Sequence, residues 1–172
     1  MSNIFLLGFM GSGKTFLGKQ LAEMMNYEFI DLDEVIEKSE GSSISGIFSS
    51  KGEEYFREKE SISLKSFSET RNAIIATGGG TPCFHDNMNW MNEHGITVYL
   101  NHSPEILFQR LKPEADHRPL LSGKSDEELL HFIQTKLQER NPFYSQSHLI
   151  VNANEIAAAA LQEKITLLIK TF

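Results

Sequence analysis

Short apolar runs alternate with longer amphipathic stretches along most of the chain. The first run, 4–7, ends at Gly8, and further apolar runs cover 27–32, 73–76, 96–100 and 148–151. Runs this short, ended by glycine or polar residues, are typical of buried strands. Between them, apolar residues at helical spacing predict helices over 15–26, 53–67, 103–111, from 125 through at least 137, and over 154–171.

Two of these helices carry clear start signals. Ser103 followed by Pro104 is typical of an N-cap with proline at the first helical position. Ser125 and Glu128 have the spacing of a capping box, in which each residue bonds the other's backbone N–H. These signals fix where the third and fourth predicted helices begin.

Five strands separated by helices predict right-handed crossovers and a parallel sheet covered on both faces, which is an α/β fold. At 172 residues, the chain fits a single domain, 1–172. Ligands of such sheets bind at the carboxyl ends of the strands. Two stretches interrupt the pattern, the Gly- and Ser-rich 40–52 and the polar 112–124, and the second is our candidate for a lid.

The first strand is followed by a complete phosphate-binding loop, Gly8-Phe9-Met10-Gly11-Ser12-Gly13-Lys14-Thr15. Its glycines allow successive backbone N–H groups to point at phosphate oxygens, and the following helix adds its positive dipole end. Lys14 is expected to reach the β and γ phosphates, and the Thr15 hydroxyl to ligate Mg²⁺. The motif predicts a P-loop NTPase-type three-layer α/β/α sandwich and by itself allows a GTPase, an ATPase or a small-molecule kinase. The sequence has no guanine-reading Asn-Lys-x-Asp, so we expect ATP, with Gly11, Ser12, Gly13, Lys14, Thr15 and Phe16 as its nucleotide-binding residues.

Composition and charge exclude several classes of function. The formal net charge of -7 argues against nucleic-acid binding, which needs excess Lys and Arg. Cys83 is the single cysteine, so neither an intramolecular disulfide nor a cysteine-rich zinc site is possible. The sequence contains no apolar stretch of membrane-spanning length and no signal-peptide pattern. We therefore expect a cytoplasmic protein with no membrane partner.

Two pairs of charged residues suggest an acceptor site. Asp31 and Asp33 end the second predicted strand, where residues two apart face the same way. One carboxylate could hold Mg²⁺ and the other could accept a proton, or both could be solvated with Asp33 capping the next helix. Arg57 and Arg140 could together bind a substrate carboxylate, although surface arginines are common.

Besides the phosphate loop, the chain contains five further motifs: Asp31-Leu32-Asp33, Gly52-Glu53-Glu54-Tyr55-Phe56-Arg57, Thr77-Gly78-Gly79-Gly80, Arg118-Pro119-Leu120-Leu121 and Arg140-Asn141-Pro142-Phe143-Tyr144. In combination, these motifs resemble those of shikimate kinase. They occur in the family's order and spacing over about residues 4–150. The resemblance implies transfer of the ATP γ-phosphoryl group to the 3-hydroxyl of shikimate, on the route to chorismate and the aromatic amino acids.

The resemblance also assigns roles to residues within a substrate segment at about 33–60 and a lid at about 112–124. Asp33 matches the aspartate that binds the shikimate hydroxyls and serves as base or orienting group, and Asp31 matches the acid near Mg²⁺. Arg57 and Arg140 match the arginines that hold the shikimate carboxylate. The remaining assignments are Gly78, Gly79 and Gly80 for substrate and γ-phosphate, Arg118 for the lid arginine over the phosphates, and Arg110 for the residue stacked on adenine.

Two segments depart from the family pattern. Pro82 stands where many members have a β-branched residue, and Asn152-Ala153-Asn154-Glu155 lacks the motif common after the fifth strand. The second departure leaves the adenine contacts on that side unassigned.

Two alternative functions are a gluconate-type kinase and a non-catalytic nucleotide-binding module. The paired arginines oppose the first, and intact Lys14, Thr15 and Asp33 oppose the second. Like most of the family, the protein is expected to be a monomer.

Overall fold

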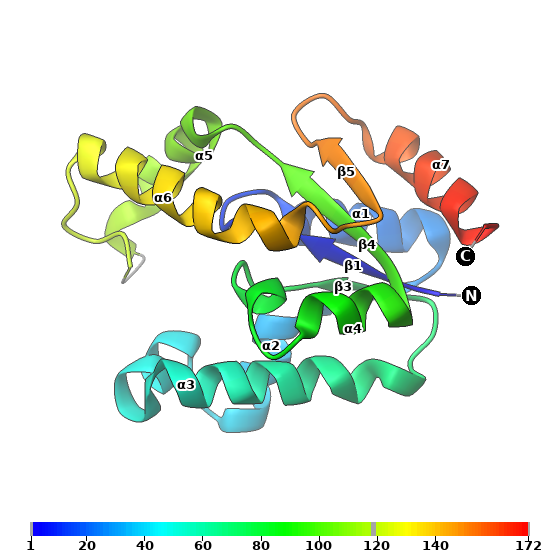
Figure 1. Ribbon diagram of the computed structural model, residues 1–172, viewed down its shortest axis with the longest axis horizontal. Coiled ribbons are helices and arrows are strands. Elements are labelled where there is room, and N and C mark those ends of the chain that lie inside the picture. Colours follow the sequence, from blue (N-terminus) through cyan, green and yellow to red (C-terminus); the bar gives the residue numbers. More distant parts are fainter. Residues whose placement is uncertain (1, 118–119, 172) are drawn as a thin grey trace.

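The protein folds as a parallel sheet with helices on both faces (Figure 1). Its computed structural model describes residues 2–117 and 120–171. The strands are β1 (Asn3–Leu7), β2 (Glu28–Asp31), β3 (Ala73–Ala76), β4 (Gly95–Asn101) and β5 (Leu149–Asn152). They lie in the order β2-β3-β1-β4-β5, and every neighbouring pair is parallel. The predicted α/β/α architecture with a five-stranded parallel sheet is confirmed.

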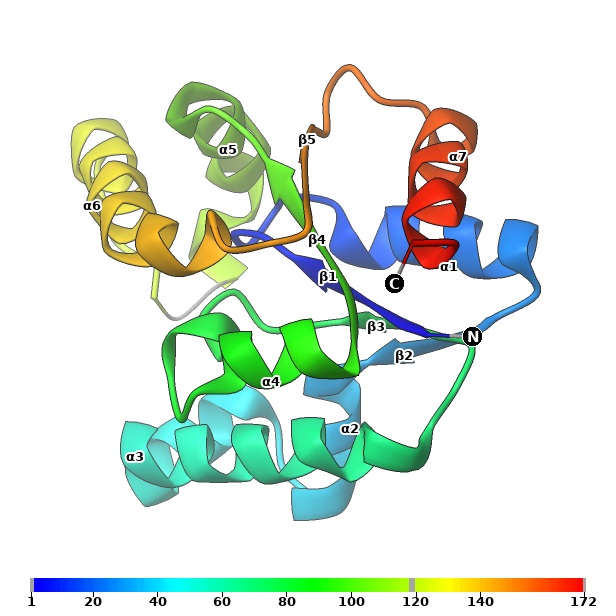
Figure 2. The same cartoon turned by 45° about the vertical axis from the view of Figure 1, so that its right-hand side comes forward.

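Seven α-helices and three short 3-10 turns lie in the described residues. The α-helices are α1 (Lys14–Met25), α2 (Leu32–Glu40), α3 (Ile44–Lys65), α4 (Asn87–His94), α5 (Pro104–Leu111), α6 (Asp126–Tyr144) and α7 (Ala158–Ile169). The turns are η1 (Ser66–Glu69), η2 (Thr81–Cys83) and η3 (Lys112–His117). Figure 2 shows α5 and α6 beside the end of β4, where Tyr144 of α6 packs against Tyr99.

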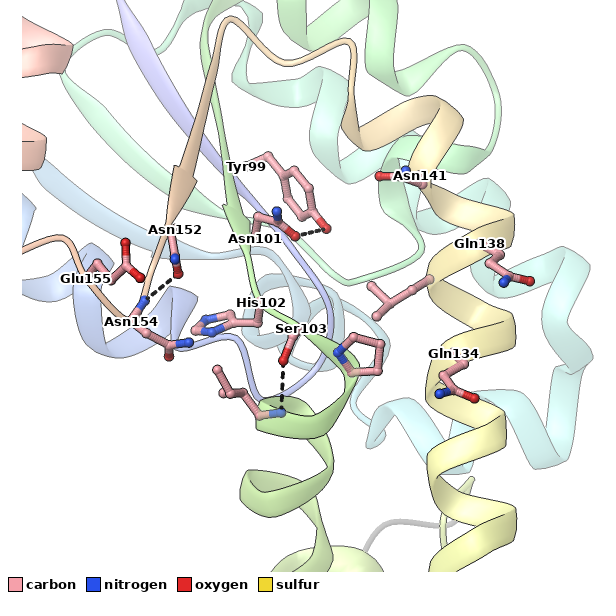
Figure 3. Close-up of a pocket in the computed structure, with 13 residues that line it drawn as sticks. Tyr99, Asn101, His102, Ser103, Gln134, Gln138, Asn141, Asn152, Asn154 and Glu155 are labelled. Atoms are coloured by element: carbon pink, nitrogen blue, oxygen red, sulfur yellow. Dashed lines mark hydrogen bonds between the residues drawn. The ribbon is translucent and has the colours of Figure 1, made fainter.

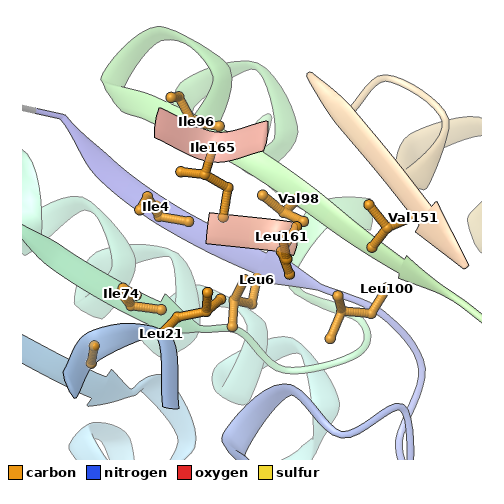
Figure 4. Packing of buried hydrophobic residues seen from close by; sticks show 11 residues of the cluster. Ile4, Leu6, Leu21, Ile74, Ile96, Val98, Leu100, Val151, Leu161 and Ile165 are labelled. Atoms are coloured by element: carbon orange, nitrogen blue, oxygen red, sulfur yellow. The ribbon is translucent and has the colours of Figure 1, made fainter. Parts of the chain in front are cut away.

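Alternation along the central strand divides the core between the two faces of the sheet. Ile4 and Leu6 point to the face covered by α1 and α7, where they meet Leu21, Leu161 and Ile165 (Figure 4). Phe5 and Leu7 of the same strand point to the opposite face, which α2, α3 and α4 cover. A strand buried on both faces has no polar side to show, which is why 4–7 reads as a continuous apolar run.

The observed bounds of several helices differ from the predicted ones, and one segment predicted as a loop is helical. Both helix caps are confirmed: the Ser103 side chain accepts from Ile106 N, and Ser125 with Glu128 forms the capping box. The last helix begins at Ala158 rather than at 154. The stretch 40–52, predicted as an irregular loop, is largely helical. The Ser43 side chain caps this first part of α3, Ile47 anchors it in the core, and Gly52 at φ 82° bends it.

Helix α4 has no counterpart among the predicted elements. Of its eight residues, only Met88 and Met91 supply a buried apolar pair, too few to establish a helical period in the sequence. Across residues 2–117 and 120–171, no helix combines the length and the apolar character needed to cross a bilayer.

Candidate active site

The phosphate loop connects the buried end of β1 to the first turn of α1. Gly11 and Gly13 have φ of 76° and 87°, a left-handed backbone that side-chain-bearing residues rarely adopt. Gly13 is the N-cap of α1, so the loop leads into the positive end of that helix dipole. Phe16 lies in this first turn with its side chain 71% exposed, and it can offer a phosphate only its backbone N–H.

The Lys14 ammonium closes over the loop that precedes it. Its Nζ donates to the carbonyl oxygens of Gly8, at 2.8 Å, and Phe9, at 3.0 Å, and lies 3.3 Å from the Ser12 hydroxyl. The loop therefore has a positive charge fixed at its centre, which is the arrangement that an oligophosphate requires.

Asp31 and Asp33 are brought to the phosphate loop by a geometry that differs from the predicted one. The chain is extended only to Asp31, and α2 begins at Leu32, so the two acids are not two positions of one strand. Asp31 itself is the N-cap: its Oδ1 accepts from Asp33 N at 3.1 Å, and its Oδ2 accepts from the Thr15 hydroxyl at 3.1 Å. Because Asp31 is the cap, the Asp33 side chain is not needed for capping, and Asp33 lies in the first helical turn.

Asp33 is a carboxyl group whose surroundings disfavour its charge. Burial, followed by the negative charges of Asp31 and Glu60, raises the pKa of Asp33 from 3.8 to about 6, while Lys14 opposes the rise. A carboxylate with a pKa close to neutrality is a better proton acceptor than an ordinary aspartate and is still ionised at pH 7. Asp33 therefore has the properties of a general base.

Arg57 is oriented by a carboxylate that sequence reasoning missed. Glu60 is fully buried, and its Oε2 accepts from Arg57 Nη1 at 2.8 Å, while its Oε1 accepts from the Thr81 hydroxyl at 2.5 Å. The guanidinium also lies over the ring of Phe84, with 4.3 Å from Cζ to the ring centroid. These contacts fix the orientation of the Arg57 guanidinium, although the side chain is 11% exposed.

Arg140 approaches the same place from α6. Its Nη1 is buried and, within the described part of the chain, has no hydrogen-bond partner. A buried guanidinium nitrogen without a partner is costly, so such an atom marks a place where an anionic group is expected. One turn further along, the buried Tyr144 hydroxyl donates to the Gly79 carbonyl at 2.5 Å and ties α6 to the glycine loop.

The glycine run after β3 leaves space for these charged side chains. A β-carbon at Gly79 would lie 2.9 Å from Arg140 Nη1, and one at Gly80 would lie 2.7 Å from Arg57 Nη2. Both distances are below ordinary van der Waals contact. The sequence predicts Gly78, Gly79 and Gly80 as a substrate loop, and the structure brings them against both arginines.

A cavity of about 550 Å³ opens between the phosphate loop, α2, α3 and the glycine loop. Its lining residues are Met10, Asp33, Ile44, Ser45, Phe48, Ser49, Gly79 and Leu120. The cavity thus contains the aspartate, a residue of the phosphate loop and the glycine loop, all predicted from separate motifs. Arg57 and Arg140 are not among its lining residues; Arg140 lies next to Gly79, which lines the cavity, and Arg57 lies next to Gly80.

The structure describes the lid candidate, 112–124, on either side of residues 118–119. Arg118 lies outside the described residues, as does Pro119. Leu121, which follows them, is fully buried in a cluster with Phe9, Leu107 and Leu111, while Leu120 is 60% exposed and reaches the cavity. A buried leucine therefore anchors the carboxyl end of this segment beside the phosphate loop.

Arg110 lies on the other side of the phosphate loop, near a second cavity of about 890 Å³ between α5, α6 and the ends of β4 and β5 (Figure 3). Its Nη1 donates to the Gly11 carbonyl at 3.2 Å. Many of the lining residues are carboxamides, among them Asn101, Asn141, Asn152 and Asn154. His102, for which the sequence gave no functional signal, contacts the phosphate loop here; its place just after β4 was the available clue.

Comparison with known proteins identifies the family to which this chain is similar. The family model for shikimate kinase matches residues 10–170. A shikimate kinase of Bacteroides thetaiotaomicron is 48% identical over 156 residues, covering 91% of this chain and 89% of the relative. One from Thermodesulfovibrio yellowstonii is 39% identical, covering 96% of this chain and 93% of the relative.

Solved structures agree with the sequence comparison. A crystal structure of shikimate kinase from Bacteroides thetaiotaomicron superposes with a TM-score of 0.90 at 43% identity, covering 98% of both chains. A shikimate kinase from Acinetobacter baumannii, solved in complex with shikimate, superposes with a TM-score of 0.84 at 36% identity, covering 99% of this chain and 94% of the other.

Proposed function

The chain belongs to the shikimate kinase family, and we propose that it transfers the γ-phosphoryl group of ATP to the 3-hydroxyl of shikimate, with Asp33, Arg57 and Arg140 forming the acceptor site. The product is shikimate 3-phosphate, an intermediate on the way to chorismate and the aromatic amino acids. The observation that carries this assignment is the cavity shared by Asp33, Met10 and Gly79, which joins a proton acceptor to the phosphate loop.

Asp33 acts on the hydroxyl that receives the phosphoryl group. The hydroxyl oxygen forms a bond to the γ-phosphorus, the bond from that phosphorus to the β–γ bridging oxygen breaks, and the hydroxyl proton passes to Asp33. A pKa of about 6 keeps the carboxylate ready to accept this proton at neutral pH. Most of the catalysis comes from positioning and charge stabilisation, as in other phosphoryl transfers.

Arg57 and Arg140 bind the carboxylate of shikimate. Both guanidinium groups lie beside the glycine loop, and the unpartnered Nη1 of Arg140 is a donor suited to a carboxylate oxygen. Arg57 pairs with both Glu60 and Glu53, so its charge is compensated within α3. The buried Nη1 of Arg140, which has no hydrogen-bond partner among the described residues, is therefore the main attraction for the anion. Binding the carboxylate at one end of the ring directs the hydroxyls towards Asp33.

Lys14 and the loop backbone bind the phosphates of ATP. The ammonium is already at the loop, and on binding it exchanges the Gly8 and Phe9 carbonyls for phosphate oxygens. Arg118, on the lid, is proposed to neutralise charge on the transferred group. Leu121 supports this role because it fixes the end of the lid segment beside the phosphate loop. Exclusion of water by the lid favours transfer to shikimate over hydrolysis.

Thr15 and Asp31 are the residues proposed to hold Mg²⁺. Their side-chain oxygens lie 3.1 Å apart next to the phosphate loop, and hydroxyl and carboxylate oxygens are the ligands that this ion prefers. When bound, Mg²⁺ neutralises charge on the β and γ phosphates. Asp31 serves both as helix cap and as candidate ligand, through different oxygens.

The proposed acceptor site draws on the phosphate loop, α2, α3, the glycine loop and α6 of one chain, which is compatible with the expected monomer. A monomeric, cytoplasmic enzyme remains our prediction from the sequence.

The direct test measures ADP release from MgATP with shikimate, with gluconate and with no acceptor. We expect release that depends on shikimate, with one phosphate on its 3-hydroxyl. Release with gluconate alone would assign the protein to the alternative kinase class. Binding of ATP without turnover on either acceptor would favour the non-catalytic nucleotide-binding module.

A further inference from the structure

The phosphate loop has carbonyl oxygens that point away from its phosphate-binding side. When the N–H groups of a loop converge on an anion, the carbonyls are directed outward and require other partners. Two side chains supply them here, one from the residue just after β4 and one from α5. Arg110 Nη1 donates to the Gly11 carbonyl at 3.2 Å, and His102 Nε2 lies 2.9 Å from the Ser12 carbonyl.

The proton of neutral His102 must be on Nε2, because a carbonyl oxygen can only accept. Arg110 Nη1 lies 3.4 Å from the same nitrogen, which then has no lone pair for it, so this pair is a contact rather than a hydrogen bond. Burial is the main cause that lowers the pKa of His102, and the ring is 5% exposed. His102 is thus a neutral donor to the loop backbone.

Asn154 extends this network to the loop after β5. Its Oδ1 accepts from Arg110 Nη2 at 3.1 Å, so both terminal nitrogens of the guanidinium are engaged, one by the phosphate loop and one by Asn154. The side chain of Asn154 lies beside the His102 ring (Figure 3). His102 Nδ1 is buried and, among the residues that the structure describes, has no hydrogen-bond partner.

We infer that His102 and Asn154 are positioning residues of the nucleotide site, with separate targets. His102 fixes the Ser12 peptide, and hence the phosphate-binding backbone. Asn154 fixes the plane of the exposed Arg110 guanidinium, which faces whatever part of the nucleotide extends beyond the loop. A guanidinium held flat offers a prepared surface for an aromatic base. The inference rests on the proposed nucleotide site and adds His102 to it, together with Asn154 from a segment that departs from the family pattern.

The two targets can be separated with two ligands. ADP carries phosphates and a base, whereas tripolyphosphate carries phosphates alone. We expect Asn154→Ala to weaken ADP binding about fivefold to tenfold, the effect of losing one hydrogen bond of typical net strength at an exposed side chain, with tripolyphosphate binding unchanged. His102→Ala should weaken both ligands, and His102→Gln should restore binding because its amide N–H can donate to the Ser12 carbonyl.

Isothermal titration calorimetry of each variant gives these affinities without any acceptor. Arg110→Ala alone and combined with Asn154→Ala completes a double-mutant cycle. If Asn154 acts through Arg110, the double variant binds ADP no more weakly than Arg110→Ala. Gln138→Ala removes a carboxamide from the opposite wall of the same cavity and should leave both affinities as in the wild type.

Unchanged ADP binding in Asn154→Ala, or additive losses in the cycle, would overturn the role of Asn154. Equal binding of both ligands by His102→Ala and the wild type would overturn that of His102. Because no acceptor is used, failure of the protein to phosphorylate shikimate would count against the proposed function alone, and the calorimetry would still decide this inference.

Discussion

Replacing Asp33 with asparagine should abolish phosphoryl transfer and at the same time stabilise the folded protein. The substitution keeps the shape of the side chain and removes only its ability to ionise. In the wild type, burial and the charges of Asp31 and Glu60 raise the pKa of Asp33 from 3.8 to about 6. The folded state therefore binds the proton of this carboxyl more tightly than the unfolded chain does.

The sign of the effect follows from this difference in proton affinity. As pH rises from about 4 to about 6, the unfolded chain releases the Asp33 proton first, so the wild-type folded state loses stability across this window. The rise from 3.8 to about 6 corresponds to about 3 kcal/mol, because each tenfold change in proton affinity is worth about 1.36 kcal/mol. Asparagine cannot ionise and does not incur this cost.

The assay is urea unfolding of the wild type and Asp33→Asn at pH 7.5 and pH 4. We expect the variant to be more stable by up to about 3 kcal/mol at pH 7.5, and by less than about 1 kcal/mol at pH 4. Glu34→Gln is the matched control, since Glu34 is an exposed acid in the same first turn of α2 and makes a similar helix-dipole contribution. A variant that is equally or less stable than the wild type at pH 7.5, after correction by this control, would refute the reasoning.

Three further substitutions test the acceptor site. Glu60→Gln removes one of the charges that raise the pKa of Asp33, so the acid limb of kcat/KM, expected near pH 6 in the wild type, should move to lower pH; an unmoved limb would contradict this. Arg140→Ala should raise the KM for shikimate roughly 30- to 160-fold, from about 2–3 kcal/mol of lost charged hydrogen bonding, and leave the KM for ATP unaltered. Tyr144→Phe should lower the free energy of unfolding by about 1–2 kcal/mol, because the Gly79 carbonyl loses the donor that the buried tyrosine supplies; equal free energies of unfolding for variant and wild type in denaturant titration would exclude that role.

The sequence predicted the sheet, the phosphate loop and the elements that carry the acceptor residues, because each depends on a local pattern. The roles of Asp31 and Asp33 were divided only by the resemblance. The spacing did not predict that Asp31 caps the helix, since a helix that begins at Leu32 cannot be distinguished from one more residue of strand by an Asp-Leu-Asp triplet. Nor did the sequence predict Glu60, which is one of several acids on a charged helix. Its burial depends on Thr81, which is 21 residues away in the chain and bonds its Oε1.

The glycine run shows how a local signal and a tertiary cause can coincide. Three consecutive glycines after β3 indicate a loop, but their number is explained by what approaches each one. A β-carbon at Gly78 would lie 2.8 Å from Glu60 Oε1, and the same test at Gly79 and Gly80 meets Arg140 and Arg57. The loop must therefore stay free of side chains because two guanidinium groups and the carboxylate that orients one of them occupy that space. It follows that adding a methyl group at any of the three would displace a charged group of the acceptor site before it disturbed the fold, so these glycines are better regarded as part of the proposed binding site than as a turn.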